Sequence, residues 1–211
     1  MKPARLWACV GLVPAVVLGR SQRGLSTHPV LRVQRRASGG GAVLTGPWML
    51  EAMLRLPRSH PVAARGPAEA ARWFGQLHLD WLREQGIAGA ALHEGRTTAH
   101  WSCFAGLGPG EVLAQGRKLT GIAQTWRRQN IYLSSGTLLF APPWERLCEV
   151  LGRPAGDAAA LRAQATSVQE CLGRQVQASG WLRTLREKLD SACLSASAGA
   201  AITSPPGSAP R

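Results

Sequence analysis

The residue whose type and position most clearly indicate chemistry is Lys118. It lies mid-chain in the segment Gly116-Arg117-Lys118-Leu119-Thr120-Gly121-Ile122-Ala123-Gln124, and the only other lysines among the 25 basic residues are Lys2 and Lys188. In a chain that otherwise uses arginine, a lysine within a strand pattern indicates a need for a compact ammonium rather than a planar guanidinium, for example at a carbonyl or a phosphate. The alternative is an ordinary solvated lysine.

A second candidate segment is Arg35-Arg36-Ala37-Ser38-Gly39-Gly40-Gly41-Ala42-Val43. Three successive glycines after the predicted strand Val30–Gln34 let the backbone approach a ligand closely, and their N–H groups can form a concavity that binds anions. The spacing matches neither the dinucleotide pattern G-x-G-x-x-G nor the phosphate loop that ends in G-K-[ST]. The segment therefore indicates a binding loop, with a flexible turn as the alternative.

The remaining titratable residues do not favour a metal site. The five cysteines are far apart and form no C-x-x-C pair, the five histidines have no ligand spacing, and the chain has three aspartates. This usage favours neither zinc nor a disulfide framework, and a reducing cytoplasm is the expected compartment. The net charge of +13 comes from scattered arginines, so specific nucleic-acid binding is not expected, although the charge would steer an acidic protein partner.

Hydrophobic periodicity and turn residues predict a sheet with flanking helices in one domain. A helix is expected to begin at Pro67 and to run from Ala68 to Gln85, where Gly86 ends it. Glu111–Ala114 and Lys118–Ala123 are predicted to form a hairpin that turns at Gln115-Gly116. The other predicted strands are Leu6–Val10, Ala15–Leu18, Val30–Gln34, Asn130–Leu133 and Thr137–Phe140, with Met49–Leu56 open between strand and helix; the other predicted helices are Pro143–Leu151, Ala158–Leu172 and Trp181–Leu194. The fold class is α+β or mixed α/β.

The two ends of the chain carry separate expectations. Lys2 and Arg5 followed by the apolar run Leu6–Leu18 resemble a signal peptide, but Gly11 and Pro14 interrupt the run, and two short strands explain it as well. The run is too short to span a bilayer. Residues 195–211 are rich in Ser, Ala, Gly and Pro, which predicts a disordered tail after a domain over residues 1–194.

Taken together, the two segments resemble the lipoate–protein ligase A family, within the biotin/lipoate protein ligases and octanoyl transferases. The family pattern R-R-x-S-G-G-G-A-V is matched by Arg35–Val43, and its G-[RK]-K-[LIV]-x-G-x-A-Q by Gly116–Gln124. Arg127-Arg128 and Gly136-Thr137-Leu138-Leu139 follow in the family order. The resemblance covers roughly residues 10 to 172.

This resemblance implies a fold and a set of site residues. The fold would be a central mixed sheet with flanking helices, as in the catalytic domain shared with class II aminoacyl-tRNA synthetases. Lys118 would contact the acyl carbonyl and the phosphate of an acyl-adenylate, and Gly39–Gly41 with Ala42 would line an acyl tunnel. The substrate-binding residues expected from the two motifs are Arg36, Ser38, Gly39, Gly40, Gly41, Ala42, Gly121 and Ala123.

The chain also departs from the family pattern. Leu44-Thr45-Gly46-Pro47-Trp48 replaces an aromatic residue, a His-Asp pair and a nearby Asn, and Ser135 stands where the family has His. The family's N-terminal helix is not evident. These departures leave the use of ATP open.

Cys103 provides a different chemistry. It precedes Arg117-Lys118 at the position where, by resemblance, ligase-like octanoyl transferases have a nucleophilic cysteine. Nearby basic groups would favour a thiolate that carries the acyl group as a thioester. A small buried apolar residue is the alternative.

Three functions therefore remain. The first is a ligase that uses ATP with magnesium to attach lipoate or octanoate, through an acyl-adenylate, to a lysine of a lipoyl-acceptor protein domain. The second is a transferase that uses Cys103 and an octanoyl carrier protein, without a cofactor. The third is a non-catalytic protein that binds lipoyl groups. For each of them we expect a cytoplasmic protein that does not bind a membrane.

Overall fold

The computed structural model describes residues 4–24 and 27–198. Six antiparallel strands form the main sheet in the order β1 (Arg5–Val10), β5 (Met49–Pro57), β9 (Asn130–Leu138), β8 (Arg117–Trp126), β7 (Val112–Ala114) and β6 (Ala90–Leu92). A smaller sheet pairs β2 (Ala15–Leu18) in parallel with β3 (Arg32–Arg35) and antiparallel with β4 (Val43–Thr45). The helices are α1 (Pro61–Ala64), α2 (Pro67–Glu84), α3 (Trp144–Val150), α4 (Gly156–Gln164), α5 (Val168–Leu172) and α6 (Ala178–Ala198).

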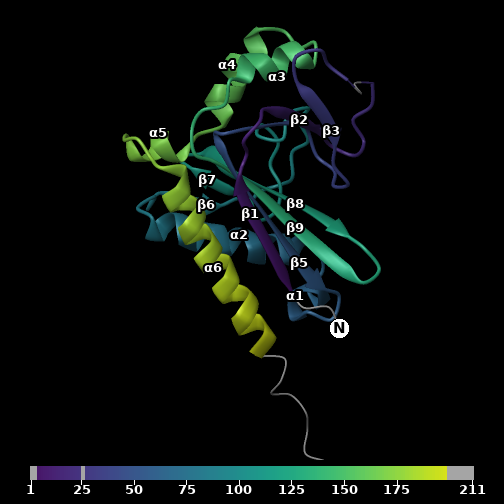
Figure 1. The fold of residues 1–211 in the computed structure, drawn as a ribbon, viewed down its shortest axis with the longest axis vertical. Coiled ribbons are helices and arrows are strands. Elements are labelled where there is room, and N and C mark those ends of the chain that lie inside the picture. The colour runs from purple at the N-terminus through teal and green to yellow at the C-terminus, as the bar shows by residue number, and fades with distance from the viewer. Residues whose placement is uncertain (1–3, 25–26, 199–211) are drawn as a thin grey trace, which may run out of the picture.

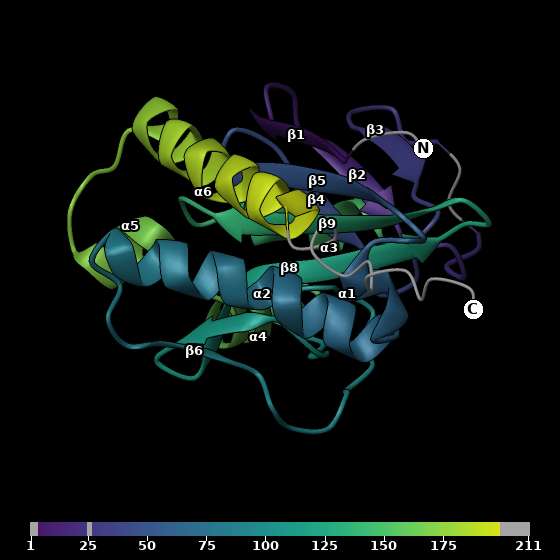
Figure 2. The same ribbon diagram turned by 90° about the horizontal axis from the view of Figure 1, so that it is seen from below.

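The long helices α2 and α6 lie side by side across one face of the main sheet (Figure 2). Leu50, Leu54 and Phe74 belong to the core between these helices and the sheet, which is the larger of two apolar clusters. Helix α2 begins at Pro67, whose fixed φ suits the first helical position, and Gly86, with a φ of 98°, follows its end. Within the residues that the structure describes, no helix is long and apolar enough to cross a membrane.

A second apolar cluster lies between the small sheet, the end of the main sheet, and α3 and α4 (Figure 1). Its members include Leu18 from β2, Leu44 from β4 and Phe104 from the long connection between β6 and β7. That connection therefore packs beside the small sheet, which brings residues from distant parts of the sequence together.

The predicted hairpin is confirmed in detail. Gln115 and Gly116 form its two-residue turn with φ values of 52° and 74°, and Ala114 pairs with Arg117. Two left-handed residues in succession are the backbone geometry of a two-residue hairpin turn that matches the twist of its strands. This turn fixes the register of β8 and hence the position of Lys118.

Three predicted elements have the wrong boundaries. Asn130–Leu133 and Thr137–Phe140 are not separate strands, because β9 runs unbroken from Asn130 to Leu138 and Gly136 pairs with both Gly121 and Glu51. The predicted helix Ala158–Leu172 breaks into α4 and α5, because residues 165–167 are extended: Ala165 makes a parallel bridge to Lys118, and Ser167 caps α5.

The structure also tests part of what was expected of the two ends of the chain. Residues 5–10 form an edge strand paired with β5, in agreement with the two-strand interpretation of the apolar run. Helix α6 continues to Ala198, past the predicted start of the tail at Ser195. Residues 199–211 of that predicted tail lie outside the described residues.

Candidate active site

A cavity of about 700 Å³ opens where three segments meet. One wall is the glycine segment after β3, with Ser38 and Gly39–Gly41. A second wall is the connection between β6 and β7, which contributes residues 97–103 and 106–109. The floor is formed by β8, with Lys118 and Ile122 to Gln124.

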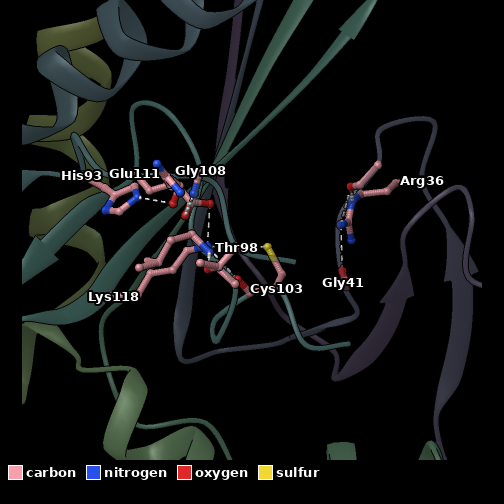
Figure 3. A network of polar contacts seen from close by, with 12 residues as sticks. Arg36, Gly41, His93, Thr98, Cys103, Gly108, Glu111 and Lys118 are labelled. Carbon is pink, nitrogen blue, oxygen red and sulfur yellow. Dashed lines mark hydrogen bonds and ion pairs between the residues drawn. The ribbon is translucent and has the colours of Figure 1, made fainter. Parts of the chain in front are cut away.

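Lys118 is buried, with its side chain 1% exposed. Its Nζ donates hydrogen bonds to the carbonyl oxygens of Cys103 (2.6 Å) and Gly106 (2.9 Å) and to Glu111 Oε1 (2.5 Å), as Figure 3 shows. These three acceptors match the three N–H bonds of an ammonium group. The lysine is thus not the solvated residue of the alternative interpretation, and it holds the Cys103 loop against β8.

Glu111 is a site residue that the sequence did not reveal. Its carboxylate is buried, and Oε2 accepts a hydrogen bond from the Gly108 N–H at 2.8 Å. Burial raises the pKa of Glu111, and the adjacent Lys118 ammonium offsets part of that increase. One signal was available: Glu111 is one of only 12 acidic residues in the chain, and it directly precedes the apolar strand Val112–Ala114.

The backbone around Glu111 is placed by close contact with α2. A Cβ on Gly75 would lie 1.8 Å from the carbonyl oxygen of Gly110, and a Cβ on Gly110 would lie 2.0 Å from that of Ala71. Gly110 also has a φ of 80°, which glycine adopts readily. These two glycines let the loop before β7 touch the helix directly, so the Glu111 carboxylate has little freedom to move.

Cys103 lines the cavity next to Lys118. Its Sγ lies 4.0 Å from Lys118 Nζ, and its backbone N–H donates to the carbonyl of Ala42 at 2.8 Å. A Cβ on Gly121 would lie 3.8 Å from this sulfur, so Gly121 leaves space beside it. In Figure 3 the sulfur lies between Lys118 and the contact of Arg36 with Gly41.

Arg117 was expected near the thiol and is not there. Successive side chains of a strand point to opposite faces, and Arg117 instead pairs with Glu170 at 2.7 Å. Lys118 is therefore the basic residue of this motif that faces Cys103.

The glycine segment is held by Arg36. The Arg36 guanidinium donates to the carbonyl oxygens of Gly39 (2.7 Å), Gly41 (2.7 Å) and Val17 (3.2 Å). Gly41 itself packs against the Cys103 segment, since a Cβ there would lie 2.5 Å from the His100 carbonyl oxygen. Gly40 has a φ of 91°, in the region that favours glycine.

Most of the predicted site residues line this one cavity. Those that line the cavity are Arg36, Ser38, Gly39, Gly40, Gly41, Cys103, Lys118 and Ala123. Ala42 is an exception, because it is fully buried in the second apolar cluster and contributes backbone hydrogen bonds rather than a cavity wall. Gly121 does not line the cavity either and lies beside the Lys118 side chain and the Cys103 sulfur.

The departure after Val43 also has a structural counterpart. Leu44 is buried in the second apolar cluster, and the Trp48 indole N–H donates to the Leu44 carbonyl oxygen at 2.9 Å. Among the described residues, His, Cys, Asp and Glu side chains form no group of three that could hold a metal ion.

Comparison with known proteins agrees with this geometry. The family model of the lipoyl protein ligase A/B catalytic domain matches residues 2–190, which is most of the chain. The chain belongs to this family. It is therefore an enzyme of the ligase or transferase type, as the two sequence motifs predicted.

Solved structures of the lipoyl protein ligase family share the fold. A lipoate-protein ligase A bound with ATP superposes with a TM-score of 0.69 at 17% identity, over 92% of this chain and 74% of that one. A bipartite lipoate protein ligase from Thermoplasma acidophilum, from a study that includes its E2 lipoyl domain, gives 0.59 at 16% identity, over 91% and 71%. LipL1 of P. falciparum in complex with lipoate gives 0.59 at 12% identity, over 90% and 48%. The comparison with curated protein sequences found no match.

Proposed function

We propose that this member of the lipoyl protein ligase A/B family transfers an octanoyl or lipoyl group to a lysine of a lipoyl acceptor domain, and that Cys103 carries the group as a thioester. The observation that carries the proposal is the position of the Cys103 thiol, 4.0 Å from the Lys118 ammonium in the wall of the cavity. The volume of about 700 Å³ lies within the range of small-molecule sites and accommodates a medium-length acyl chain.

The acyl group is transferred in two steps, first from the donor to Cys103 and then from Cys103 to the acceptor lysine. In the first, the Cys103 thiolate attacks the thioester carbonyl of the donor. A bond forms between Cys103 Sγ and the acyl carbon, the C–S bond of the donor breaks, and the donor thiol takes up the proton given up by Cys103. In the second, the neutral amine of the acceptor lysine attacks the acyl carbon, the bond to Cys103 breaks, and the amine proton returns to the sulfur. Each step passes through negative charge on the carbonyl oxygen, which backbone N–H groups of the glycine segment that lines the cavity can stabilise.

Three side chains support these steps. Lys118 holds the Cys103 loop in the cavity wall by donating to the carbonyl oxygens of Cys103 and Gly106, with Nζ beside the sulfur. Arg36 holds the glycine segment in place through its carbonyl oxygens. Because Gly39 to Gly41 have no side chains, the acyl group can approach the backbone of this segment closely.

A ligase that forms an acyl-adenylate is the second candidate. The glycine segment lining the cavity favours it, and a structural neighbour was solved with ATP bound. The described residues of this cavity do not fit a nucleoside triphosphate with magnesium well, because Arg36 and Lys118 both donate to protein acceptors.

One experiment separates these functions. The protein is incubated with a lipoyl acceptor domain and either octanoyl carrier protein or octanoate with ATP and magnesium, and the intact mass of the acceptor is measured. We expect octanoylation from the carrier protein without ATP, loss of activity in Cys103→Ser, and retention in Cys171→Ser, because Cys171 contacts Thr166 and does not line the cavity. Activity of Cys103→Ser that depends on ATP would instead support the ligase. Failure of both donors would leave a lipoyl-binding protein.

A further inference from the structure

The Lys118 ammonium is shared between a carboxylate and a thiol. Its Nζ lies 2.5 Å from Glu111 Oε1 and 4.0 Å from Cys103 Sγ. Lys118 and Glu111 are both buried, with side chains 1% and 6% exposed, so solvent screens their charges little. The carboxylate is the nearer partner and has a full negative charge to offset the ammonium.

Glu111 cannot easily release Lys118. Its other oxygen, Oε2, is bound by the Gly108 N–H, and the loop carrying it is packed on α2 through Gly110 and Gly75. Moving the carboxylate would break a buried hydrogen bond and leave polar atoms without partners. The pair is therefore a fixed part of the cavity wall.

The other charged or titratable groups around the thiol are also occupied. Arg36, on the segment after β3, interacts electrostatically with Cys103, but its guanidinium is bound to carbonyl oxygens of the glycine segment. His100, on the same connection as Cys103, accepts the Ser102 N–H at Nδ1 (3.1 Å). A neutral imidazole that accepts at Nδ1 has its proton on Nε2, so His100 cannot take a proton from the thiol at Nε2 in this arrangement.

We infer that Glu111 is a positioning residue that holds the Lys118 ammonium on the Cys103 loop and cancels its charge, and thereby sets the reactivity of the Cys103 thiol. With Glu111 charged, the ammonium and the carboxylate form a nearly neutral pair beside the sulfur. Without that carboxylate, the ammonium would face the sulfur uncompensated and would favour the thiolate. Glu111 thus keeps the Cys103 thiol less reactive than it would be beside an uncompensated ammonium.

This inference deepens the proposed function and rests on it for its role in catalysis. The test of Glu111 is independent of the proposed function, because the reactivity of a thiol can be measured without an acyl donor or acceptor. If Cys103→Ser retained acyl transfer, the proposed function would fail while the effect of Glu111 on the thiol could still hold. If Glu111→Gln left the thiol unchanged, the inference would fail by itself.

The experiment measures the alkylation rate of Cys103 by the uncharged reagent iodoacetamide, resolved by peptide mass spectrometry, in the full chain. At pH 7 we expect Glu111→Gln to react about threefold to tenfold faster than wild type, since a unit charge near the thiol changes its ionised fraction strongly while the nucleophilicity of the sulfur falls somewhat. Between pH 7 and pH 10 the ratio should fall to one or slightly below, because high pH ionises the thiol regardless of Glu111 and leaves only the lower nucleophilicity of a thiolate beside an uncompensated ammonium. A faster reaction caused only by loosening of the loop would persist at pH 10.

Glu170→Gln is the matched control. It removes one carboxylate from an ion pair with Arg117, the neighbour of Lys118 on β8, and Glu170 does not line the cavity. It should leave the alkylation of Cys103 at the wild-type rate. An equal acceleration in this variant would mean that net charge, and not Glu111, controls the thiol.

A double variant keeps the test decisive if Glu111→Gln does not fold. Glu111→Gln with Lys118→Met removes both charges, which buried pairs often tolerate better than the loss of one partner. Because the pair is nearly neutral in the wild type, the double variant should react at a rate close to wild type at pH 7. A rate lowered tenfold or more would show that the Lys118 charge acts on the thiol uncompensated, and would overturn the inference. An unchanged alkylation rate in a folded Glu111→Gln variant would also overturn the inference.

Discussion

Replacement of Gly41 by alanine should separate the two walls of the cavity. A Cβ at this position would lie 2.5 Å from the His100 carbonyl oxygen and 2.6 Å from Ser102 C and the Trp101 carbonyl oxygen. That is roughly 0.8 Å short of ordinary van der Waals contact, and all three atoms belong to the backbone. The neighbouring hydrogen bonds of Ala42, to Trp101 at 2.7 Å and from Cys103 at 2.8 Å, join the same two segments, so side-chain rotation cannot relieve the strain.

The expected cost of this substitution is about 1–3 kcal/mol of unfolding free energy, as for other overpacked sites. For a chain of this length each kcal/mol lowers the melting temperature by about 2–4 °C. A shift of the Cys103 segment approaching 1 Å should also slow single-turnover acyl transfer by about 100-fold. Gly39→Ala is the control for stability, because a Cβ there has nothing within 4 Å. Equal melting temperatures for the two variants, with transfer retained by Gly41→Ala, would show that the close contact of Gly41 with the Cys103 segment does not position the cavity walls.

Three further substitutions have distinct expected outcomes. Lys118→Ala should abolish transfer and lower stability by about 3–5 kcal/mol, because it leaves the buried Glu111 without its partner; a near-wild-type transfer rate would contradict its role. His78→Phe should remove a pH dependence: burial lowers the pKa of His78 to about 4 from its ordinary 6.5, so the wild type should lose up to about 3 kcal/mol as the pH falls from 6.5 to 4, and urea unfolding at several pH values measures this. A variant with the wild-type pH dependence would show that another group causes it. Arg117→Ala removes a partly exposed pair with Glu170 and a hydrogen bond of 3.4 Å to the Ala165 carbonyl oxygen, and should cost about 1 kcal/mol without slowing transfer, whereas a tenfold slower rate would place Arg117 in the site.

Local signals in the sequence were sufficient for much of the fold. Pro67 and Gly86 bound a helix with apolar residues at helical spacing, and Gln115-Gly116 defines a two-residue turn between apolar segments. These features depend on residues close in sequence. Where tertiary contacts decide the outcome, the pattern failed: the extended Ala165 that separates α4 from α5 is stabilised by pairing with Lys118, a contact between residues far apart in the chain.

The sequence motifs predicted which segments form the site, but not which side chains contact each other within it. The glycine segment and Lys118 were recognisable because their residue types are unusual in this chain, and Cys103 by its position before the lysine motif. Glu111 could not be assigned, because its proximity to Lys118 depends on how the loop before β7 packs against Gly75 of α2. Ala42 was placed in the cavity wall by its motif, but its side chain points into the second core.

Whether Cys103 carries the acyl group is measured most directly by the mass of the protein itself after mixing with octanoyl carrier protein in the absence of acceptor and ATP. We expect the protein to gain one octanoyl group that hydroxylamine removes, that peptide mapping assigns to Cys103, and that passes to a lipoyl domain added afterwards. Cys103→Ser should not acquire it. An unmodified wild-type protein that nevertheless octanoylates the acceptor from the same donor would contradict the claim.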